Sequence, residues 1–192
     1  MNKPLVIIVT GPPATGKTTV GTKIADALRL PFINKDGIKE SLFDTLGWSD
    51  VAWSKRLGVA SYAILYQVIE AELRAGASFV VESNFHPTYD NERFAAFRTT
   101  YDFVPFQVFC TANGTVLYER FKARSESGER HPGHRDELRQ GEFEEILRRG
   151  HHDPLDIGGE TYELDMTDLD TVDFDGLMTA IHSRTIHLAS GI

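Results

Sequence analysis

A glycine-rich loop between an apolar run and an amphipathic helix constrains the fold of this chain more than any other feature. Leu5–Val9 is a continuous run of mostly β-branched residues, which is typical of a central parallel strand buried on both faces. Gly11–Gly16 comes directly after it, and Lys17–Leu30 has the periodicity of a helix with one apolar face. A strand, a tight loop and a helix in this order predict the first unit of a parallel α/β sheet.

The rest of the chain continues to alternate between strand and helix patterns. We expect strands at 31–33, 78–82, 104–111 and 161–165, and helices at 36–46, 50–75, 90–99, 114–124, 137–149 and 174–187. The segment 125–135 is polar and rich in Gly, Arg and His, which favours a mobile loop. The pattern predicts a three-layer α/β fold, with a five-stranded parallel sheet and helices on both faces.

Length and composition are those of a single globular domain. The chain has 192 residues, 41% of them hydrophobic, so we predict one domain over 1–192. No apolar run approaches the roughly 18 residues of a membrane-spanning helix. The formal charge of −8 makes nucleic acid an unfavourable partner, because such binding relies on basic residues. Cys110 is the only cysteine, which fits a reducing compartment, and we expect a cytoplasmic protein.

The loop after the first strand carries the strongest chemical signal. Gly11–Thr18 matches G-x-x-x-x-G-K-[ST], the P-loop pattern, in its expected place between a strand and a helix. The backbone amides around Gly11, Ala14, Thr15 and Gly16 are expected to cradle the phosphates of ATP. Lys17 is expected between the β- and γ-phosphates, Thr18 on Mg²⁺, and Thr19 near the α-phosphate.

A GTPase-type switch is disfavoured by the residues after the second and third strands. Such proteins need D-x-x-G after one strand and N-K-x-D after a later one. Asn34-Lys35-Asp36-Gly37 has the wrong spacing, and Glu82-Ser83-Asn84-Phe85 is not D-x-x-G. A kinase is therefore the favoured class.

The chain resembles the small P-loop kinases of the adenylate-kinase-like superfamily. It is most similar to the branch with chloramphenicol phosphotransferase, zeta toxins and polynucleotide 5′-kinase domains. The resemblance spans most of residues 4–186 and depends on four features: Gly11–Thr18, Asp36 after the second strand, Glu82–Phe85 after the third, and an arginine-rich lid after the fourth. It implies a strand order of 2-3-1-4-5, a lid at about 125–141, and ATP-dependent transfer of a phosphoryl group to a hydroxyl.

The resemblance also implies roles for residues after the second and third strands. Asp36 would orient the acceptor hydroxyl and take its proton, although an aspartate there can instead cap the following helix. Glu82 would bind Mg²⁺ and border the acceptor, unless it is a strand-end residue paired with a lysine. Asn84 and His86 would contact the acceptor, or else serve only as turn residues.

The resemblance implies lid arginines that clamp the phosphates, and three arginines of this chain are candidates. Arg120 and Arg124 share a helix face and Arg130 comes after them, and we favour Arg124 as the catalytic one. Pairing with nearby glutamates on a solvated face is the alternative for Arg120. Four histidines leave a zinc site open as an alternative, although their spacing matches no defined zinc motif: His131, His134, His151 and His152.

The sequence leaves open the assignment of two stretches, one apolar and one polar. The stripe within 51–73 is either core packing or a wall of the acceptor pocket. Thr167–Val172 comes after the last strand, where the resembling kinases hold adenine.

The sequence thus predicts an ATP- and Mg²⁺-dependent kinase whose acceptor is the hydroxyl of a small molecule, such as a metabolite, an antibiotic, a nucleoside or a sugar nucleotide. A polynucleotide 5′-hydroxyl kinase and a non-catalytic ATP-binding protein are the alternatives. Asp36 and the lid distinguish a kinase from a protein that only binds ATP, because the latter needs neither.

Overall fold

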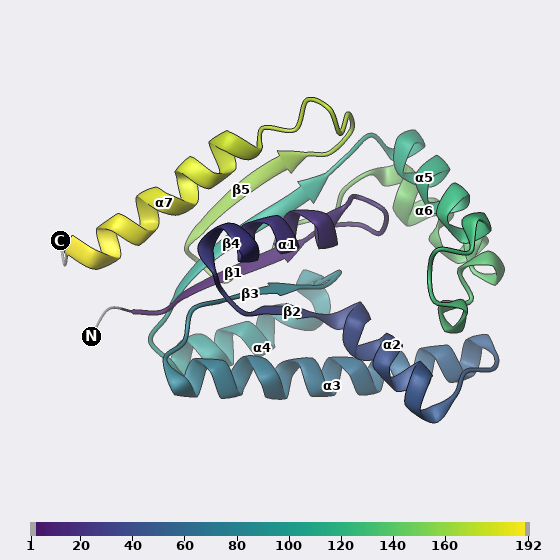
Figure 1. Ribbon diagram of the computed structural model, residues 1–192, viewed down its shortest axis with the longest axis horizontal. Coiled ribbons are helices and arrows are strands. Elements are labelled where there is room, and N and C mark those ends of the chain that lie inside the picture. Colours follow the sequence, from purple (N-terminus) through teal and green to yellow (C-terminus); the bar gives the residue numbers. More distant parts are fainter. Residues whose placement is uncertain (1–2, 191–192) are drawn as a thin grey trace.

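The computed structural model describes residues 3–190, with a parallel sheet at its centre (Figure 1). The strands are β1 (Leu5–Thr10), β2 (Phe32–Asn34), β3 (Phe79–Glu82), β4 (Val104–Thr111) and β5 (Glu160–Asp165). Their order is β2-β3-β1-β4-β5, and all four pairings are parallel. The predicted fold class and strand order are confirmed. Of the predicted domain 1–192, residues 1–2 and 191–192 lie outside the described part.

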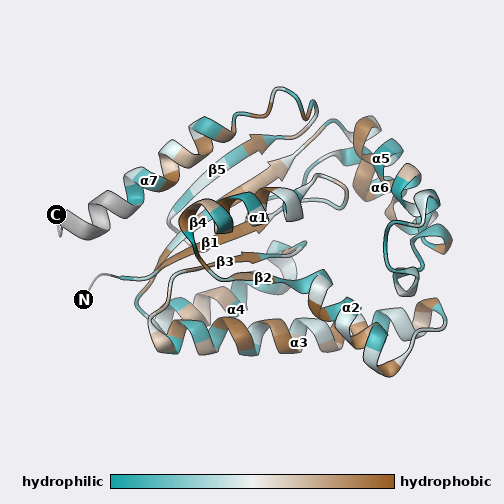
Figure 2. Cartoon of the chain, in the orientation of Figure 1, coloured by the Kyte–Doolittle hydropathy of each residue, from teal (hydrophilic) through white to brown (hydrophobic). Residues whose placement is uncertain are grey.

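Helices cover both faces of the sheet. They are α1 (Lys17–Leu28), α2 (Lys35–Leu46), α3 (Val51–Ala75), α4 (Pro87–Thr100), α5 (Gly114–Ser127), α6 (Gln140–Arg149) and α7 (Phe174–Ser190). One core cluster joins the sheet to α1, α5, α6 and α7, and the other joins it to α3 and α4. The central strands β1 and β3 are accordingly buried along their whole length and mostly apolar (Figure 2). Among the described residues, no helix is both long and apolar enough to cross a membrane.

The carboxyl ends of the strands are where the active-site elements gather. In Figure 1, α2 and the segment between α5 and α6 both project beyond this edge, from distant parts of the sequence. The buried residues of α3 are Leu57, Leu65, Ile69 and Leu73 together with Ser54 and Ser61. Most of the α3 stripe is therefore core.

The polar segment after α5 is more regular than the sequence predicts. The sequence predicts a loop over 125–135 and a helix from 137, but α5 continues to Ser127 and α6 begins only at Gln140. Between them, Pro132–His134 and Asp136–Leu138 form 3-10 turns, η1 and η2. The reason is tertiary contact: Gly133 packs on the ring of Phe43, so closely that an added Cβ would lie 2.6 Å from it. No local periodicity encodes that contact.

The segment 150–159 crosses back over the sheet without forming a helix. Its backbone is held by the buried side chain of Gln107 in β4, whose Oε1 accepts from Leu155 N at 2.8 Å. The amide Nε2 of Gln107 donates to the carbonyl oxygen of Leu155 and to Thr161 Oγ1. This crossing brings His152 against Phe109 and His86 at the edge of the site.

Candidate active site

The P-loop has the backbone geometry that its sequence requires. Gly11, Ala14 and Gly16 have positive φ values of 142°, 64° and 90°. At Gly11, which follows β1, a Cβ would lie 2.1 Å from the carbonyl oxygen of Cys110 in β4, so only glycine fits at this position. Helix α1 begins at Lys17, and no side chain caps its first amides. The loop thus offers backbone N–H donors at a helix N-terminus, which suits phosphate.

Lys17 is buried within the loop that precedes it. Its Nζ donates to the carbonyl oxygen of Pro12 at 2.6 Å and to Thr15 Oγ1 at 3.4 Å. Burial lowers the pKa of Lys17, while the carboxylates of Glu82 and Asp36 act in the opposite sense. A buried ammonium group whose hydrogen bonds run to neutral oxygens is suited to receive an anion.

A buried carboxylate stands opposite the start of α1. Glu82, at the end of β3 and 6% exposed, accepts hydrogen bonds from Thr18 Oγ1 at 3.0 Å and from Asn34 Nδ2. Burial raises its pKa, against the opposing charges of Lys17 and Lys35, and no lysine or arginine of the described residues forms an ion pair with it. The alternative that Glu82 pairs with a lysine is wrong. A hydroxyl and a carboxylate in contact are the hard oxygen donors that fit Mg²⁺.

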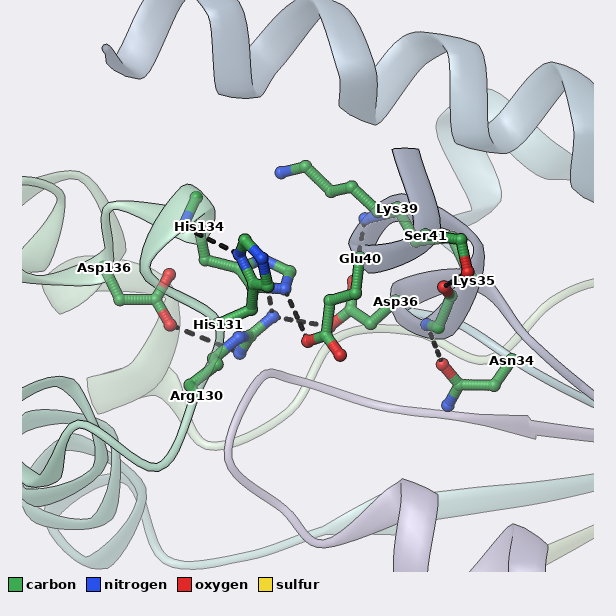
Figure 3. Close-up of polar contacts among 12 residues, drawn as sticks. Asn34, Lys35, Asp36, Lys39, Glu40, Ser41, Arg130, His131, His134 and Asp136 are labelled. Carbon is green, nitrogen blue, oxygen red and sulfur yellow. Dashed lines mark hydrogen bonds and ion pairs between the residues drawn. The ribbon is translucent and has the colours of Figure 1, made fainter. Parts of the chain in front are cut away.

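Asp36 lies in the first turn of α2 with both carboxylate oxygens engaged. Oδ1 pairs with Lys35 Nζ at 2.9 Å, and Oδ2 pairs with Arg130 Nη2 at 2.5 Å (Figure 3). Burial alone would raise the pKa of Asp36, but the charges of Lys35 and Arg130 outweigh it and hold the pKa far below its usual range. Asp36 does not cap α2: the cap is Asn34, whose Oδ1 accepts from Gly37 N.

Arg124 and Arg130 converge on a second buried carboxylate. Asp136 Oδ2 lies 3.2 Å from Arg130 Nη1 and 3.6 Å from Arg124 Nη2. The Nε and Nη2 groups of Arg124 are buried and have no hydrogen-bond partner, so Arg124 retains free donors. Unsatisfied guanidinium donors beside a phosphate-binding loop favour an anionic ligand.

The P-loop and the lid enclose one cavity. It has a volume of about 480 Å³, which is within the range of small-ligand sites. Its lining combines the predicted residues Thr18, Asp36, Arg124 and Arg130 with four to which the sequence assigned no role: Asn34, Gly37, Glu40 and Glu129.

Among the described residues, Arg120 forms an ion pair with no glutamate. Its guanidinium donates to the carbonyl oxygens of Met166 and Thr167, at 2.6 and 2.9 Å, and so holds the loop after β5. A second cavity of about 200 Å³ opens between this loop and α1. The loop after β5 contributes the apolar residues Met166, Leu169, Val172 and Phe174 to its lining, and the start of α1 contributes Gly16, Thr19, Val20 and Lys23.

Asn84 and His86 do not line the 480 Å³ cavity. The His86 side chain accepts from Thr88 N and caps α4, which is the turn role, and the carbonyl oxygen of Asn84 accepts from the Tyr62 hydroxyl. The rings of His86 and His152 lie 5.3 Å apart between centroids. A contact of either side chain with an acceptor stays a prediction.

The histidines do not form a metal site. Among the described residues, no group of three or more His, Cys, Asp or Glu side chains is placed to hold a metal ion. His131 instead contacts Asp44, and His134 contacts Glu40 and Arg130.

Sequence reasoning missed the partners that organise Asp36. The Asn34 cap has a clear local signal, an asparagine before a helical pattern. Lys35 stands next to Asp36 in the sequence, but Asp136, Glu40 and His134 are brought to the site only by tertiary contacts and carried no motif.

Comparisons with known proteins agree with this geometry. A family model described as an AAA domain matches residues 6–149. A protein of Chloroflexus aurantiacus J-10-fl, described as a "putative kinase", is 40% identical, with 94% of this chain and 98% of that chain covered and a TM-score of 0.85. A gluconokinase from Sinorhizobium meliloti 1021 is 17% identical, covers 99% of both chains and has a TM-score of 0.57, so it shares the fold. No curated protein matches. With a matched domain over most of its length and a P-loop of the required geometry, the chain belongs to this AAA domain family and is a small P-loop kinase of the adenylate-kinase-like superfamily.

Proposed function

We propose that this kinase uses ATP and Mg²⁺ to phosphorylate a hydroxyl group of a small molecule. The observation that supports this most is the shared cavity, in which the Thr18 end of the P-loop faces Asp36 and the lid arginines across about 480 Å³. A protein that only binds ATP has no need of a carboxylate and two guanidinium groups opposite its phosphates.

The binding residues divide between the two cavities. The P-loop amides and Lys17 would hold the β- and γ-phosphates, with Thr18 and Glu82 as the residues that would hold Mg²⁺. When bound, the metal ion neutralises phosphate charge. The base would lie in the 200 Å³ cavity beside Thr19, whose wall Arg120 supports through the carbonyl oxygens of Met166 and Thr167.

The reacting groups would meet in the larger cavity. The acceptor oxygen forms a bond to the γ-phosphorus, the bond from that phosphorus to the β,γ-bridging oxygen breaks, and ADP leaves. Arg124 and Arg130 would stabilise charge on the transferring group. Asp36 would orient the acceptor hydroxyl and accept its proton as the bond to phosphorus forms.

The acceptor is best sought among small hydroxyl compounds. The cavity suits a small ligand, and the formal charge of −8 is unfavourable for a polynucleotide. A screen of sugars, polyols, hydroxy acids, nucleosides and hydroxylated antibiotics for ADP production above the ATPase background tests this. Stimulation by at least one compound, with little dependence on salt, is expected. Stimulation only by polynucleotide 5′ ends would overturn the small-acceptor proposal, and tight ATP binding with no stimulation at all would leave a binding protein.

Asp36→Asn is the sharpest single-residue test. It should keep ATP affinity within about threefold and lower acceptor-dependent turnover by about 100-fold or more, because the amide cannot receive the proton. Asp102→Asn is the matched control, since Asp102 is exposed and pairs only with Lys3 on the opposite edge of the sheet. Unchanged turnover in the Asp36 variant would remove this residue from the mechanism.

A further inference from the structure

His134 is a lid residue that touches both the lid arginine and α2. Its side chain is 4% exposed, with Nδ1 3.1 Å from Arg130 Nη2 and Nε2 2.9 Å from Glu40 Oε1 (Figure 3). Arg130 Nη2 is also the atom that pairs with Asp36. One guanidinium nitrogen therefore joins His134 to the carboxylate that faces the acceptor.

The partners of the ring decide where its proton lies. A guanidinium group can only donate hydrogen bonds, so Nδ1 of His134 must accept and carry no proton. The proton is then on Nε2, which donates to the Glu40 carboxylate. The neutral ring satisfies both neighbours, whereas the doubly protonated ring would direct an N–H group at the Arg130 guanidinium.

We propose that neutral His134 is the positioning residue that holds Arg130 on Asp36, and that protonation of His134 releases the lid from α2. The consequence for phosphoryl transfer rests on the proposed function. The lid contact itself does not, because it is present in the protein alone.

The charges around His134 favour its neutral form. Helix α2 faces it with Asp36, Lys39 and Glu40, the lid faces it with Arg130, and α3 contributes the Ser54 hydroxyl, which donates to the His134 carbonyl oxygen. Burial lowers the pKa of His134, and Arg130 and Lys39 lower it further, against the opposing effects of Glu40 and Asp36.

Asp36, Glu40 and Lys39, which face His134 from α2, do not change charge in the same pH range. The pKa of Asp36 and that of Glu40 lie below their usual values. Burial lowers the pKa of Lys39 to about 8, so Lys39 stays mostly protonated below pH 7, with Nζ donating to Ser54 Oγ at 3.0 Å. His131 is the remaining histidine, stacked on the other side of Phe43 and in contact with Asp44.

The sign of the effect follows from linkage. A released ring has a pKa of about 6.5 and the docked ring a lower one, so the released state binds more protons. Docking is therefore fully stable above pH 6.5 and weakens as the pH falls below it. Between pH 7.0 and 5.5, release should increase by up to about eightfold.

Amide hydrogen exchange of the lid tests the proposal without nucleotide or acceptor. The reporters are the amides of the 3-10 turns, those of His134, Arg135, Leu138 and Arg139, which hydrogen-bond within the lid. Rates at pH 7.0 and 5.5 are divided by the intrinsic rate of each amide at that pH. In the wild-type protein we expect the corrected rates to rise at pH 5.5, by up to about eightfold.

Two substitutions separate the two ring nitrogens. In His134→Asn the amide oxygen takes the place of Nδ1 and can accept from Arg130, so protection at pH 7.0 should persist and its pH dependence should vanish. In His134→Gln the amide lies nearer to Nε2, so Arg130 loses its acceptor and exchange at pH 7.0 should rise by about tenfold. His131→Asn is the control and should keep the wild-type response, because asparagine can still cap Gly133 N.

Three outcomes would overturn the proposal: a corrected wild-type rate independent of pH, a pH response that survives in His134→Asn, or one that disappears in His131→Asn. Thermal unfolding of each variant identifies any that fails to fold, and His134→Asn alone still decides the pH question. Unchanged turnover in Asp36→Asn would remove Asp36 from the proposed mechanism but leave these exchange results standing.

Discussion

Thr18 and Glu82 are joined by a hydrogen bond of 3.0 Å, from the hydroxyl of the first turn of α1 to the carboxylate at the end of β3. The pairing of β1 with β3 creates this contact, because it aligns Val9 with Glu82 and so places the P-loop beside the end of β3. Two oxygen ligands suited to Mg²⁺ thus come from segments 64 residues apart.

Glu82→Gln should make the protein without ligands at least as stable as the wild type at pH 8. Burial raises the pKa of Glu82, so folding is opposed by its charge at high pH and this cost disappears as the pH falls and the carboxyl group protonates. The difference in Tm between variant and wild type should therefore be largest at high pH and shrink on acidification. Thermal unfolding from pH 5 to 8 measures it.

The same variant should lose at least about tenfold in affinity for Mg²⁺–ATP, while metal-free ATP binds as before. Glu70→Gln, a change to an exposed glutamate on α3, is the control. A Tm advantage that grows at low pH, or Mg²⁺–ATP affinity equal to that of the wild type, would contradict the role given to Glu82.

Lys17→Met should weaken ATP binding by about 100-fold. Its ammonium group is buried in the P-loop, and a charged hydrogen-bond donor in such a place stabilises bound phosphate strongly. Because burial lowers the pKa of Lys17, its loss should cost little stability. Isothermal titration with ATP, together with a melting curve, checks both parts, and Lys122→Met, a change to an exposed lysine on α5, is the comparison. ATP affinity within threefold of the wild type would count against Lys17.

Arg120→Ala should separate binding of the base from binding of the phosphates. The side chain supports the loop after β5 through two carbonyl oxygens, so its removal should lower ATP affinity by about tenfold. Affinity for inorganic tripolyphosphate should stay within about twofold. Arg148→Ala, which removes an exposed side chain paired with Glu144 in α6, is the control. Equal losses for ATP and tripolyphosphate would place Arg120 at the phosphates instead.

A pair of glycine substitutions tests the packing that carries the lid. Gly114 begins α5, and a Cβ there would lie 2.0 Å from the carbonyl oxygen of Arg148, so Gly114→Ala should destabilise the fold by about 2 kcal/mol. Gly141 lies in α6 with open space around it, and Gly141→Ala should stabilise by about 0.5 kcal/mol. Urea unfolding measures both, and a neutral Gly114→Ala would show that α5 and α6 separate easily.

Local sequence determined the architecture and the phosphate site. The apolar run of β1 and the periodicities after it specify a parallel sheet. Gly11–Thr18 specifies a loop conformation that few other sequences can adopt. The strand order and the expectation for Asp36 came from the resemblance. Neither the spacing of the strands along the sequence nor their hydropathy determines the order of five parallel strands in the sheet. Within the site, Thr18, Asp36, Arg124 and Arg130, named from the motif and the resemblance, line one cavity.

Tertiary structure alone decided how those groups are charged and restrained. Nothing near Arg130 in the sequence indicates that its guanidinium bridges Asp36, 94 residues away, and Asp136. The polar segment 125–135 has no apolar face of its own and becomes ordered turns because Phe43, Glu40 and Asp36 lie opposite it. Hydrophobic periodicity is a property of neighbours along the chain, whereas ion pairs and pKa values depend on distance in space and on exclusion of water, and these exist only in the folded molecule.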